Sequence, residues 1–384
     1  MTVTKPPFAV PTMAEIAKVE PNGLTVVSTF SGGGGSCTGY RMAGYQVVWA
    51  NEFEPTAAAT YAANHPEVHL DTRNIRDVQG SDILEAIGLD SIDVLDGSPP
   101  CQSFSMAGKR SKGWGQVIKH SDNTTQRSDD LFGEYIRLVG ELRPRAFIAE
   151  NVKGLVMGVS KGQFKRIMRS LTELGYRVGA RLLDAQWLGV PQMRQRVFIV
   201  GIRNDLNRSP AYPAPLPYRY SIADACPWIV RMGSDGGLSA SYMPRQVINA
   251  ESGVAPTVMA DSFFNQSLTG QRKYWVEARP VSRRGRPDLP HRRWEIPNPF
   301  AREATVNQTA PTILASNAGW SDFVVENRKL TIDEVKRLCS FPDDYKLPGS
   351  YDQQWARLGN SVPPLMARAV GQAVAHVINQ TVAA

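Results

Sequence analysis

Residues 25–35 read TVVSTFSGGGG, a β-rich run that ends in four consecutive glycines. The run predicts a buried strand, and a helical pattern follows the glycines. Glycines at this junction let the backbone turn tightly and approach a ligand closely. The Lys-Ser/Thr pair of a phosphate-binding loop is missing, and Cys37 takes the place of the third glycine in the dinucleotide spacing that begins at Gly32. The stretch indicates a nucleotide-like cofactor, with a tight loop that binds no ligand as the alternative.

Strand and helix patterns alternate around this stretch, from Leu24 to Ile202. Strand-like runs occupy 46–50, 92–96, 146–149 and 196–202, and helical patterns occupy 56–64, 129–142 and 164–174. The alternation predicts an α/β fold in which helices cover both faces of a mostly parallel sheet. Ligands of such sheets bind at the carboxyl ends of the strands.

A proline-spaced linker, residues 209–217, ends this pattern. The chain is then irregular, basic and aromatic to about 326, and helices are predicted at 331–339, where Thr331 and Glu334 form a capping box, and from 364 to about 378. We therefore predict an extended N-terminal arm, an α/β domain, a smaller irregular domain, a connection with a short helix and a C-terminal segment that returns to the α/β domain. Their bounds are 1–21, 22–204, 205–326, 327–354 and 355–384.

The composition is that of a globular protein: of 384 residues, 42% are hydrophobic and 21% charged, which excludes a disordered or fibrous chain. No apolar run is long enough to cross a membrane, and residues 1–23 lack the apolar stretch of a signal peptide, so we expect a cytoplasmic protein. Four widely spaced cysteines predict free thiols and no metal site.

The net charge is +7, and five of these charges come from residues 270–305. Such a segment indicates a polyanion partner, although a solvated basic surface has the same composition.

The predicted second strand ends in Asn51-Glu52-Phe53. An acid here, about 20 residues after a glycine loop, is placed to bind a ribose diol. The aromatic ring of Phe53 can lie on an adenine. A lone acid would more often be a surface residue, but the glycine loop favours ribose binding by Glu52.

The sharpest feature is GSPPCQSFS, residues 97–105. Two prolines fix the backbone after a strand and hold Cys101 at its carboxyl end. A thiolate is a soft nucleophile, so Cys101 is the candidate catalytic residue, whereas a lone cysteine is usually a small buried hydrophobe.

Two further runs complete the candidate site. Glu150, in Glu150-Asn151-Val152, follows the next strand at the same edge and can act as an acid beside the nucleophile. In an extended segment alternate side chains share a face, so we expect Gln192, Arg194 and Arg196 to converge on an anion or a base edge. A solvated basic turn is the alternative.

Together these motifs resemble the carbon-5 cytosine-specific DNA methyltransferase family. The order of the elements is the family's: 30–35, 51–53, 97–105, 127–132, 150–152, 192–196, 328–331 with 341–343, and 359–362. The resemblance covers most of the chain outside residues 1–21 and the middle of 205–305. It implies a Rossmann-like domain that binds S-adenosyl-L-methionine.

The resemblance also implies a mechanism on double-stranded DNA. Cys101 would add to carbon 6 of a cytosine that has been flipped out of the duplex. Glu150 would act at ring nitrogen 3. Arg196, and behind it Arg194, would contact the carbonyl side of the base and the covalent intermediate.

The residues implied in cofactor binding surround the glycine loop. They are Phe30, Ser31, Gly32, Gly34, Gly35, Glu52, Phe53, Asn74, Ile75, Pro99, Leu131, Asn360, Ser361 and Val362. The family usually has Asp where this chain has Asn74, so Asn74, Asp71 and Asp77 are the candidates for contact with the adenine.

DNA contacts are implied in two regions. Residues 105–126, with Ser105, Lys109 and Arg110, correspond to the family's mobile loop over DNA, with a surface loop of no such role as the alternative. Residues 205–326 correspond to the target recognition domain, with Arg283, Arg284, Arg286 and Thr312 as candidate contacts. Its arginines would bind either guanine edges or phosphates.

The remaining expectations concern partners and rival functions. We expect a monomer with no metal and no membrane partner, and a cognate restriction endonuclease is a candidate partner. An RNA cytosine methyltransferase is disfavoured because its Cys-Phe-Thr element is missing. A catalytically silent DNA-binding relative is disfavoured because each catalytic residue is present, and Pro-Pro-Cys-Gln disfavours a dinucleotide oxidoreductase.

Overall fold

The computed structural model describes residues 4–100, 118–119, 125–126, 131–157, 161–229, 302–304, 308–314, 323–325 and 330–380. Within them a seven-stranded sheet has the order β3-β2-β1-β4-β7-β9-β8. Its strands are β1 (Thr25–Thr29), β2 (Gln46–Asn51), β3 (His69–Asp71), β4 (Val94–Gly97), β7 (Ala146–Val152), β8 (Tyr176–Asp184) and β9 (Gln195–Arg203). The first five in this order are parallel, and β9 runs antiparallel to both β7 and β8. The predicted mostly parallel α/β sheet is confirmed.

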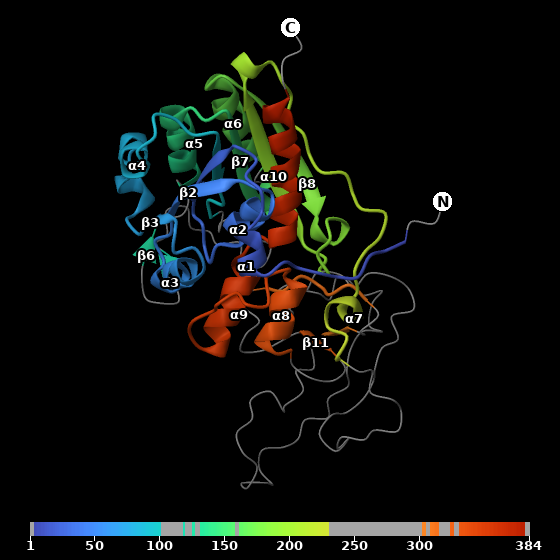
Figure 1. Ribbon diagram of the computed structural model, residues 1–384. Coiled ribbons are helices and arrows are strands. Elements are labelled where there is room, and N and C mark those ends of the chain that lie inside the picture. Colours follow the sequence, from blue (N-terminus) through green and yellow to red (C-terminus); the bar gives the residue numbers. More distant parts are fainter. Residues whose placement is uncertain are drawn as a thin grey trace, which may run out of the picture.

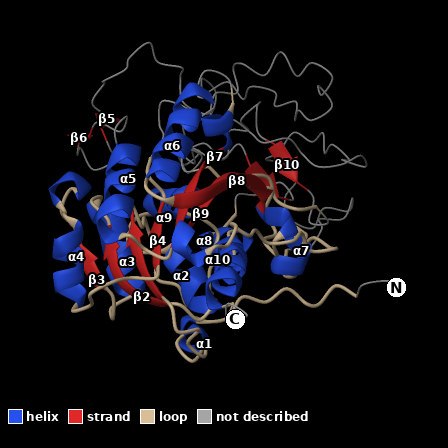
Figure 2. Ribbon diagram, turned by 90° about the horizontal axis from the view of Figure 1, so that it is seen from above, coloured by secondary structure: helices blue, strands red, loops and turns tan. Residues whose placement is uncertain are grey.

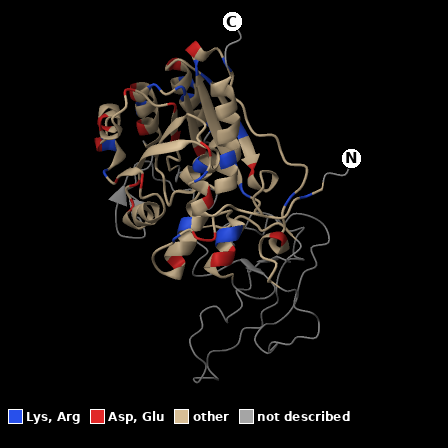
Figure 3. Cartoon of the chain, viewed as in Figure 1, with Lys and Arg blue, Asp and Glu red and all other residues tan. Residues whose placement is uncertain are grey.

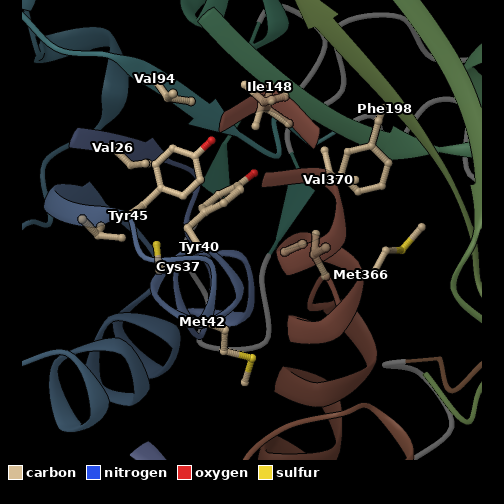
Figure 4. Close-up of a cluster of buried hydrophobic side chains, with 14 of the residues drawn as sticks. Val26, Cys37, Tyr40, Met42, Tyr45, Val94, Ile148, Phe198, Met366 and Val370 are labelled. Carbon is tan, nitrogen blue, oxygen red and sulfur yellow. The ribbon is translucent and has the colours of Figure 1, made fainter. Parts of the chain in front are cut away.

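Helices cover both faces of the sheet (Figures 1 and 2). One face carries α2 (Gly35–Met42) and α10 (Pro364–Asn379), and the other carries α4 (Gly80–Ile87), α5 (Leu131–Leu142) and α6 (Lys161–Glu173). Figure 4 shows the first face, where Tyr40 and Tyr45 pack beside Met366 and Val370. A Cβ atom on Gly39 would lie 2.4 Å from the Pro364 carbonyl oxygen, so this glycine permits the close approach of α2 and α10. The helix α10 is drawn almost entirely tan in Figure 3, as its burial requires.

A second group of helices lies beyond the carboxyl ends of the parallel strands (Figure 1). It contains α7 (Ile222–Ala225), α8 (Ile332–Leu338) and α9 (Tyr351–Asn360), which share a buried apolar cluster with Ala310 and Ile313. We call residues 330–360 the C-terminal lobe. The capping box predicted at Thr331 and Glu334 is confirmed at the start of α8.

We expected an extended N-terminal arm, but the arm contains the short helix α1 (Met13–Ile16), which Thr12 and Glu15 cap. The arm is held to other parts of the chain: Lys5 pairs with Asp224 at 2.7 Å, and the Met13 N–H donates to Asp344 at 2.9 Å. The other α-helix of the described ranges is α3 (Pro55–Asn64). Two short strand pairs are β5 (Ile118–Lys119) with β6 (Thr125–Gln126) and β10 (Arg302–Ala304) with β11 (Phe323–Val325). No helix in the described ranges has the length and hydropathy to cross a bilayer.

A carboxyl group is buried in the centre of the sheet. Asp96 accepts hydrogen bonds from Ser28 Oγ at 2.9 Å and from the Tyr40 hydroxyl at 2.8 Å, and burial raises its pKa to about 7. Ser28 Oγ also lies 3.0 Å from Ser31 Oγ, so this network connects β4, α2 and the glycine loop. Asp96 comes five residues before Cys101.

Asp96→Asn is expected to change how stability depends on pH. The pKa of Asp96 is higher in the folded protein than its unfolded value of about 3.9, so this carboxyl group does not destabilise the fold at a pH below about 3.9. It destabilises the fold increasingly as the pH rises through about 7. The free energy of unfolding of the variant, relative to the wild type, should therefore rise between pH 4 and pH 7. Urea unfolding across this range measures the difference. The exposed Asp333→Asn variant is the control, and parallel curves for Asp96→Asn and wild type would contradict the assignment.

Candidate active site

The glycine loop between β1 and α2 has a left-handed backbone. The φ angles of Gly32 and Gly34 are 56° and 88°, and Phe30, with a φ of 52°, adopts a conformation that costs a non-glycine residue about 1–2 kcal/mol. A Cβ atom on Gly32 would meet no atom within 4 Å, whereas one on Gly34 would lie 2.6 Å from both His65 Nε2 and the Tyr345 hydroxyl. The loop is therefore open at Gly32 and closely packed at Gly34.

Glu52 lies against this loop from the end of β2. Its carboxylate accepts from the Gly32 N–H at 2.7 Å and from the Glu54 N–H at 2.8 Å, and burial raises its pKa. Phe53 follows and is half-buried. The structure thus brings together the glycine loop and the acid that the sequence paired with it.

Other predicted cofactor residues border the same loop. Leu131 is buried at the start of α5, in the apolar cluster against which Phe30 packs. A Cβ atom on Gly35 would lie 2.3 Å from the Val362 carbonyl oxygen, so residues 361–362 return to the loop as predicted. Asn360, just before them, is exposed. The Ser31 N–H donates to the Asn51 carbonyl at 3.0 Å, which joins the loop to β2.

The three candidates for adenine contact lie close together. The Asn74 side chain accepts from the Arg76 N–H at 3.2 Å and caps the short helix η1 (Ile75–Asp77), whose first residue is buried. Asp71 pairs with Arg73 at 2.7 Å. Asp77 is exposed. All three therefore remain candidates for contact with the adenine.

Cys101 lies outside the described residues, but the turn that leads to it is defined. In the β4–β7 register Gly97 lies opposite Ala149, so Glu150 comes just beyond the end of β4. The Asn151 side-chain amide donates to the Pro99 carbonyl at 3.0 Å. Buried Pro99 is therefore held beside Glu150, two residues before Cys101.

Glu150 is paired with one of the two predicted arginines. The Arg196 Nε atom lies 2.8 Å from Glu150 Oε1, and the side chains of Arg196 and Glu150 are only 14% and 11% exposed. Burial lowers the pKa of Arg196, while the Glu150 carboxylate opposes that shift. The pair places a carboxyl and a guanidinium group at the strand edge where the Pro99 turn ends.

Gln192 and Arg194 contact the C-terminal lobe, whereas Arg196 pairs with Glu150. The guanidinium of Arg194 is buried and donates to the carbonyls of Ile313 at 3.1 Å and Gly359 at 2.9 Å. Burial and the Arg196 charge lower its pKa to about 9. Gln192 Nε2 contacts Cys339 Sγ at 3.2 Å. These two side chains connect the α/β domain to the C-terminal lobe.

The side chain of Thr312 is buried, and its hydroxyl donates to the Met193 carbonyl, so it joins 308–314 to the α/β domain. The other predicted DNA contacts lie outside the described residues: Ser105, Lys109, Arg110, Arg283, Arg284 and Arg286. In the described ranges no three His, Cys, Asp or Glu side chains gather as a metal site.

Three residues of the site had no role in the sequence prediction. Asn151 donates to the Pro99 carbonyl, Asp96 accepts from Ser28 at the strand before the glycine loop, and Tyr345 contacts the loop from the C-terminal lobe. Asp96 could have been identified from the sequence, because an acid stands out within the apolar strand-like run 92–96. No local pattern pointed to Tyr345, since its partner lies 312 positions away.

Comparison with known proteins agrees with this geometry. Residues 24–376 match the family model for C-5 cytosine-specific DNA methylases. The Type II methyltransferase M1.HphI of Haemophilus parahaemolyticus is 29% identical over 353 residues, which cover 91% of this chain and 86% of that protein. M.FnuDI of Fusobacterium nucleatum is 29% identical over 367 residues, which cover 92% and 95%.

Solved structures share the fold. A DNMT2 variant from Spodoptera frugiperda aligns with a TM-score of 0.59 and 18% identity, over 93% of this chain and all of that one. The Entamoeba histolytica methyltransferase EhMeth aligns with a TM-score of 0.58 and 15% identity, over 93% and 98%. With the family model matched across most of its length, the chain belongs to the C-5 cytosine-specific DNA methylase family.

Proposed function

We propose that this enzyme transfers a methyl group from S-adenosyl-L-methionine to carbon 5 of a cytosine flipped out of a specific double-stranded DNA sequence, through a covalent Cys101 adduct at carbon 6. The observation that carries this proposal is the Glu150–Arg196 pair beside the Pro99 turn. The glycine loop and Glu52 lie at the carboxyl ends of the neighbouring strands β1 and β2. A cofactor site and a nucleophile turn therefore share one sheet edge.

The residues present suit an adenosine-containing cofactor. The open backbone at Gly32 permits close approach, and the Glu52 carboxylate beside it can accept from a ribose diol. Phe53 offers an aromatic face to the adenine, and Asn74, Asp71 or Asp77 can contact the edge of the adenine. When bound, S-adenosylmethionine supplies an electrophilic methyl group.

The chain's own residues would make the cytosine ring reactive. The Cys101 thiolate forms a carbon–sulfur bond at carbon 6, and Glu150 holds or donates a proton at nitrogen 3 as negative charge reaches the ring. Arg196 keeps Glu150 oriented and can contact the neighbouring carbonyl. Once carbon 5 carries the methyl group, a base removes the carbon-5 proton, the carbon–sulfur bond breaks and the thiolate leaves.

We further propose that the enzyme acts as a monomer and that residues 205–326 recognise the DNA site. The relatives' designation as Type II methyltransferases supports a cognate restriction endonuclease as partner. Base-resolution mapping of 5-methylcytosine in DNA and RNA from cells that express the chain tests the substrate. Methylation of one DNA motif is expected, and methylation confined to RNA would overturn the proposal.

Glu52→Gln is expected to weaken binding of S-adenosylmethionine about tenfold or more, because a charge-assisted hydrogen bond to the ribose is lost. The ribose is remote from the charge that develops on cytosine, so kcat at saturating cofactor should change little. Calorimetric binding and steady-state kinetics measure the two effects. Glu67→Gln, which alters a partly exposed ion pair with Arg41, is the control. A large fall in kcat with unchanged affinity would contradict the ribose role.

A further inference from the structure

The outer surface of the helix α6 carries four exposed cations. They are Lys161, Lys165, Arg166 and Arg169. The inner surface of the helix packs Ile167 and Leu171 into the apolar cluster on this face of the sheet. Residues four apart share one face of an α-helix, so Lys161, Lys165 and Arg169 form a line about 12 Å long, at about 1.5 Å per residue. We call these three residues the α6 stripe.

No carboxylate of the described residues forms an ion pair with any of the four cations. The helix α5 lies beside α6 (Figure 2), and there Arg137 pairs with Glu134 and Glu141, each at 2.8 Å. The helix α4 contains Asp82 and Glu85 and no cation. Of the three helices on this face of the sheet, α6 therefore carries the unpaired positive charge.

The charges of α6 are arranged against the stability of the helix. Its first turn contains Lys161 and no acid, and its last turn contains Glu173 and no cation. The helix dipole favours the reverse order, and the like charges of Lys161 and Lys165, four residues apart, repel each other. Folding alone does not account for this arrangement, whereas an anion bound at the outer surface would offset both unfavourable effects.

The stripe begins at the edge of the sheet that carries the candidate active site. The strand β7 ends at Val152, two residues after Glu150, and the short helix η3 (Lys153–Val156) connects it toward α6. The strand β8, which begins at Tyr176 just after α6, runs parallel to β7 because both are antiparallel to β9. The helix α6 therefore runs back from the carboxyl edge of the sheet to the amino edge, and Lys161 lies at the carboxyl edge.

We propose that the α6 stripe binds the phosphate backbone of the DNA that flanks the target cytosine. This inference rests on the proposed function, because a duplex held at the active-site edge is the polyanion that comes close to Lys161. A duplex carries one negative charge per about 1.7 Å of its axis, so a stripe of about 12 Å faces several phosphates. Phosphate contacts carry no sequence information, so the stripe strengthens binding without selecting the motif.

The test compares two double variants that lose the same charge. Lys161→Gln/Lys165→Gln removes two cations of the stripe. Arg143→Gln/Arg177→Gln is the matched control, since both arginines are exposed and lie at the opposite, amino edge of the sheet, before β7 and at the start of β8. Fluorescence anisotropy measures the dissociation constant of the full chain at several salt concentrations, with a duplex that carries the mapped motif and with one that lacks it.

The stripe variant is expected to bind both duplexes at least about tenfold more weakly at 0.1 M salt, and the salt slope of binding should fall by about 1.8, or 0.9 for each lost phosphate contact. The control should bind as the wild type does. The methylated motif and the affinity for S-adenosylmethionine should not change in either variant. The stripe variant should also resist urea at least as well as the wild type, because a repulsion within α6 is removed.

An unchanged salt slope, or an equal loss of affinity in the control, would overturn the inference and leave the stripe a solvated surface. Weakening confined to the duplex with the motif would also overturn it, because that result indicates a contact with a base. Failure of the wild type to bind or methylate DNA would instead overturn the proposed function.

Discussion

Replacement of Cys101 with serine is expected to lower the rate of methyl transfer at least about 10³-fold, or roughly 4 kcal/mol in the activation barrier. A hydroxyl is far less nucleophilic than a thiolate, so the addition to carbon 6 fails while the cofactor and DNA still bind. Single-turnover assays with radiolabelled cofactor measure the rate, and gel-shift titration measures DNA binding.

The other cysteines provide the controls for this variant. Cys37, Cys226 and Cys339 are buried. Burial raises the pKa of Cys37 to about 12 and that of Cys339 to about 11, so neither of these two thiols supplies a thiolate at neutral pH. Cys226→Ala should keep its activity. Substantial turnover by Cys101→Ser would exclude Cys101 as the nucleophile.

Glu150→Gln is expected to lower kcat by about 10²- to 10⁴-fold, the usual contribution of a positioned general acid. Glutamine keeps the shape of the side chain but can neither donate a carboxyl proton nor balance the Arg196 charge. Glu134→Gln is the matched control, because Glu134 also pairs with an arginine at 2.8 Å, on the outer helix α5.

Two measurements separate catalysis from folding in this variant. Circular dichroism should show that Glu150→Gln is folded, with an unfolding transition that comes earlier than that of the wild type because the variant leaves one buried charge uncompensated. The affinity for S-adenosylmethionine should not change. If kcat stays within a few-fold of the wild type, Glu150 is not the acid.

The elements that the sequence predicted best are those with local signals. The strand before the glycines, the Thr331 capping box and the final helix were placed closely, because β-branched runs, caps and prolines act within a few residues. The strand β8 was missed, although its apolar residues Tyr176, Val178, Ala180 and Leu182 alternate with Arg177, Gly179 and Arg181. The short helix α1 was also missed, because it is marked only by a capping box within a segment that has no hydrophobic periodicity.

The site was predictable where the sheet itself brings residues together. Glu52 meets Gly32 and Glu150 meets Arg196 because adjacent strands carry them to one edge. The roles of Arg194 and Thr312 were not predictable, because each contacts a main-chain carbonyl 119 positions away. The spacing of residues along the sequence does not predict contacts between residues so far apart.

The most direct test of the covalent mechanism uses duplex DNA in which 5-fluorocytosine replaces cytosine within the mapped motif. Fluorine cannot leave carbon 5 as a proton does, so the carbon–sulfur bond should persist after methyl transfer. Intact-mass spectrometry of the denatured complex should show protein joined to methylated DNA, only with S-adenosylmethionine present, and peptide mapping should place the link at Cys101. A denaturation-resistant complex that forms equally with Cys101→Ser, or no complex with an enzyme that methylates the unmodified duplex, would contradict the mechanism.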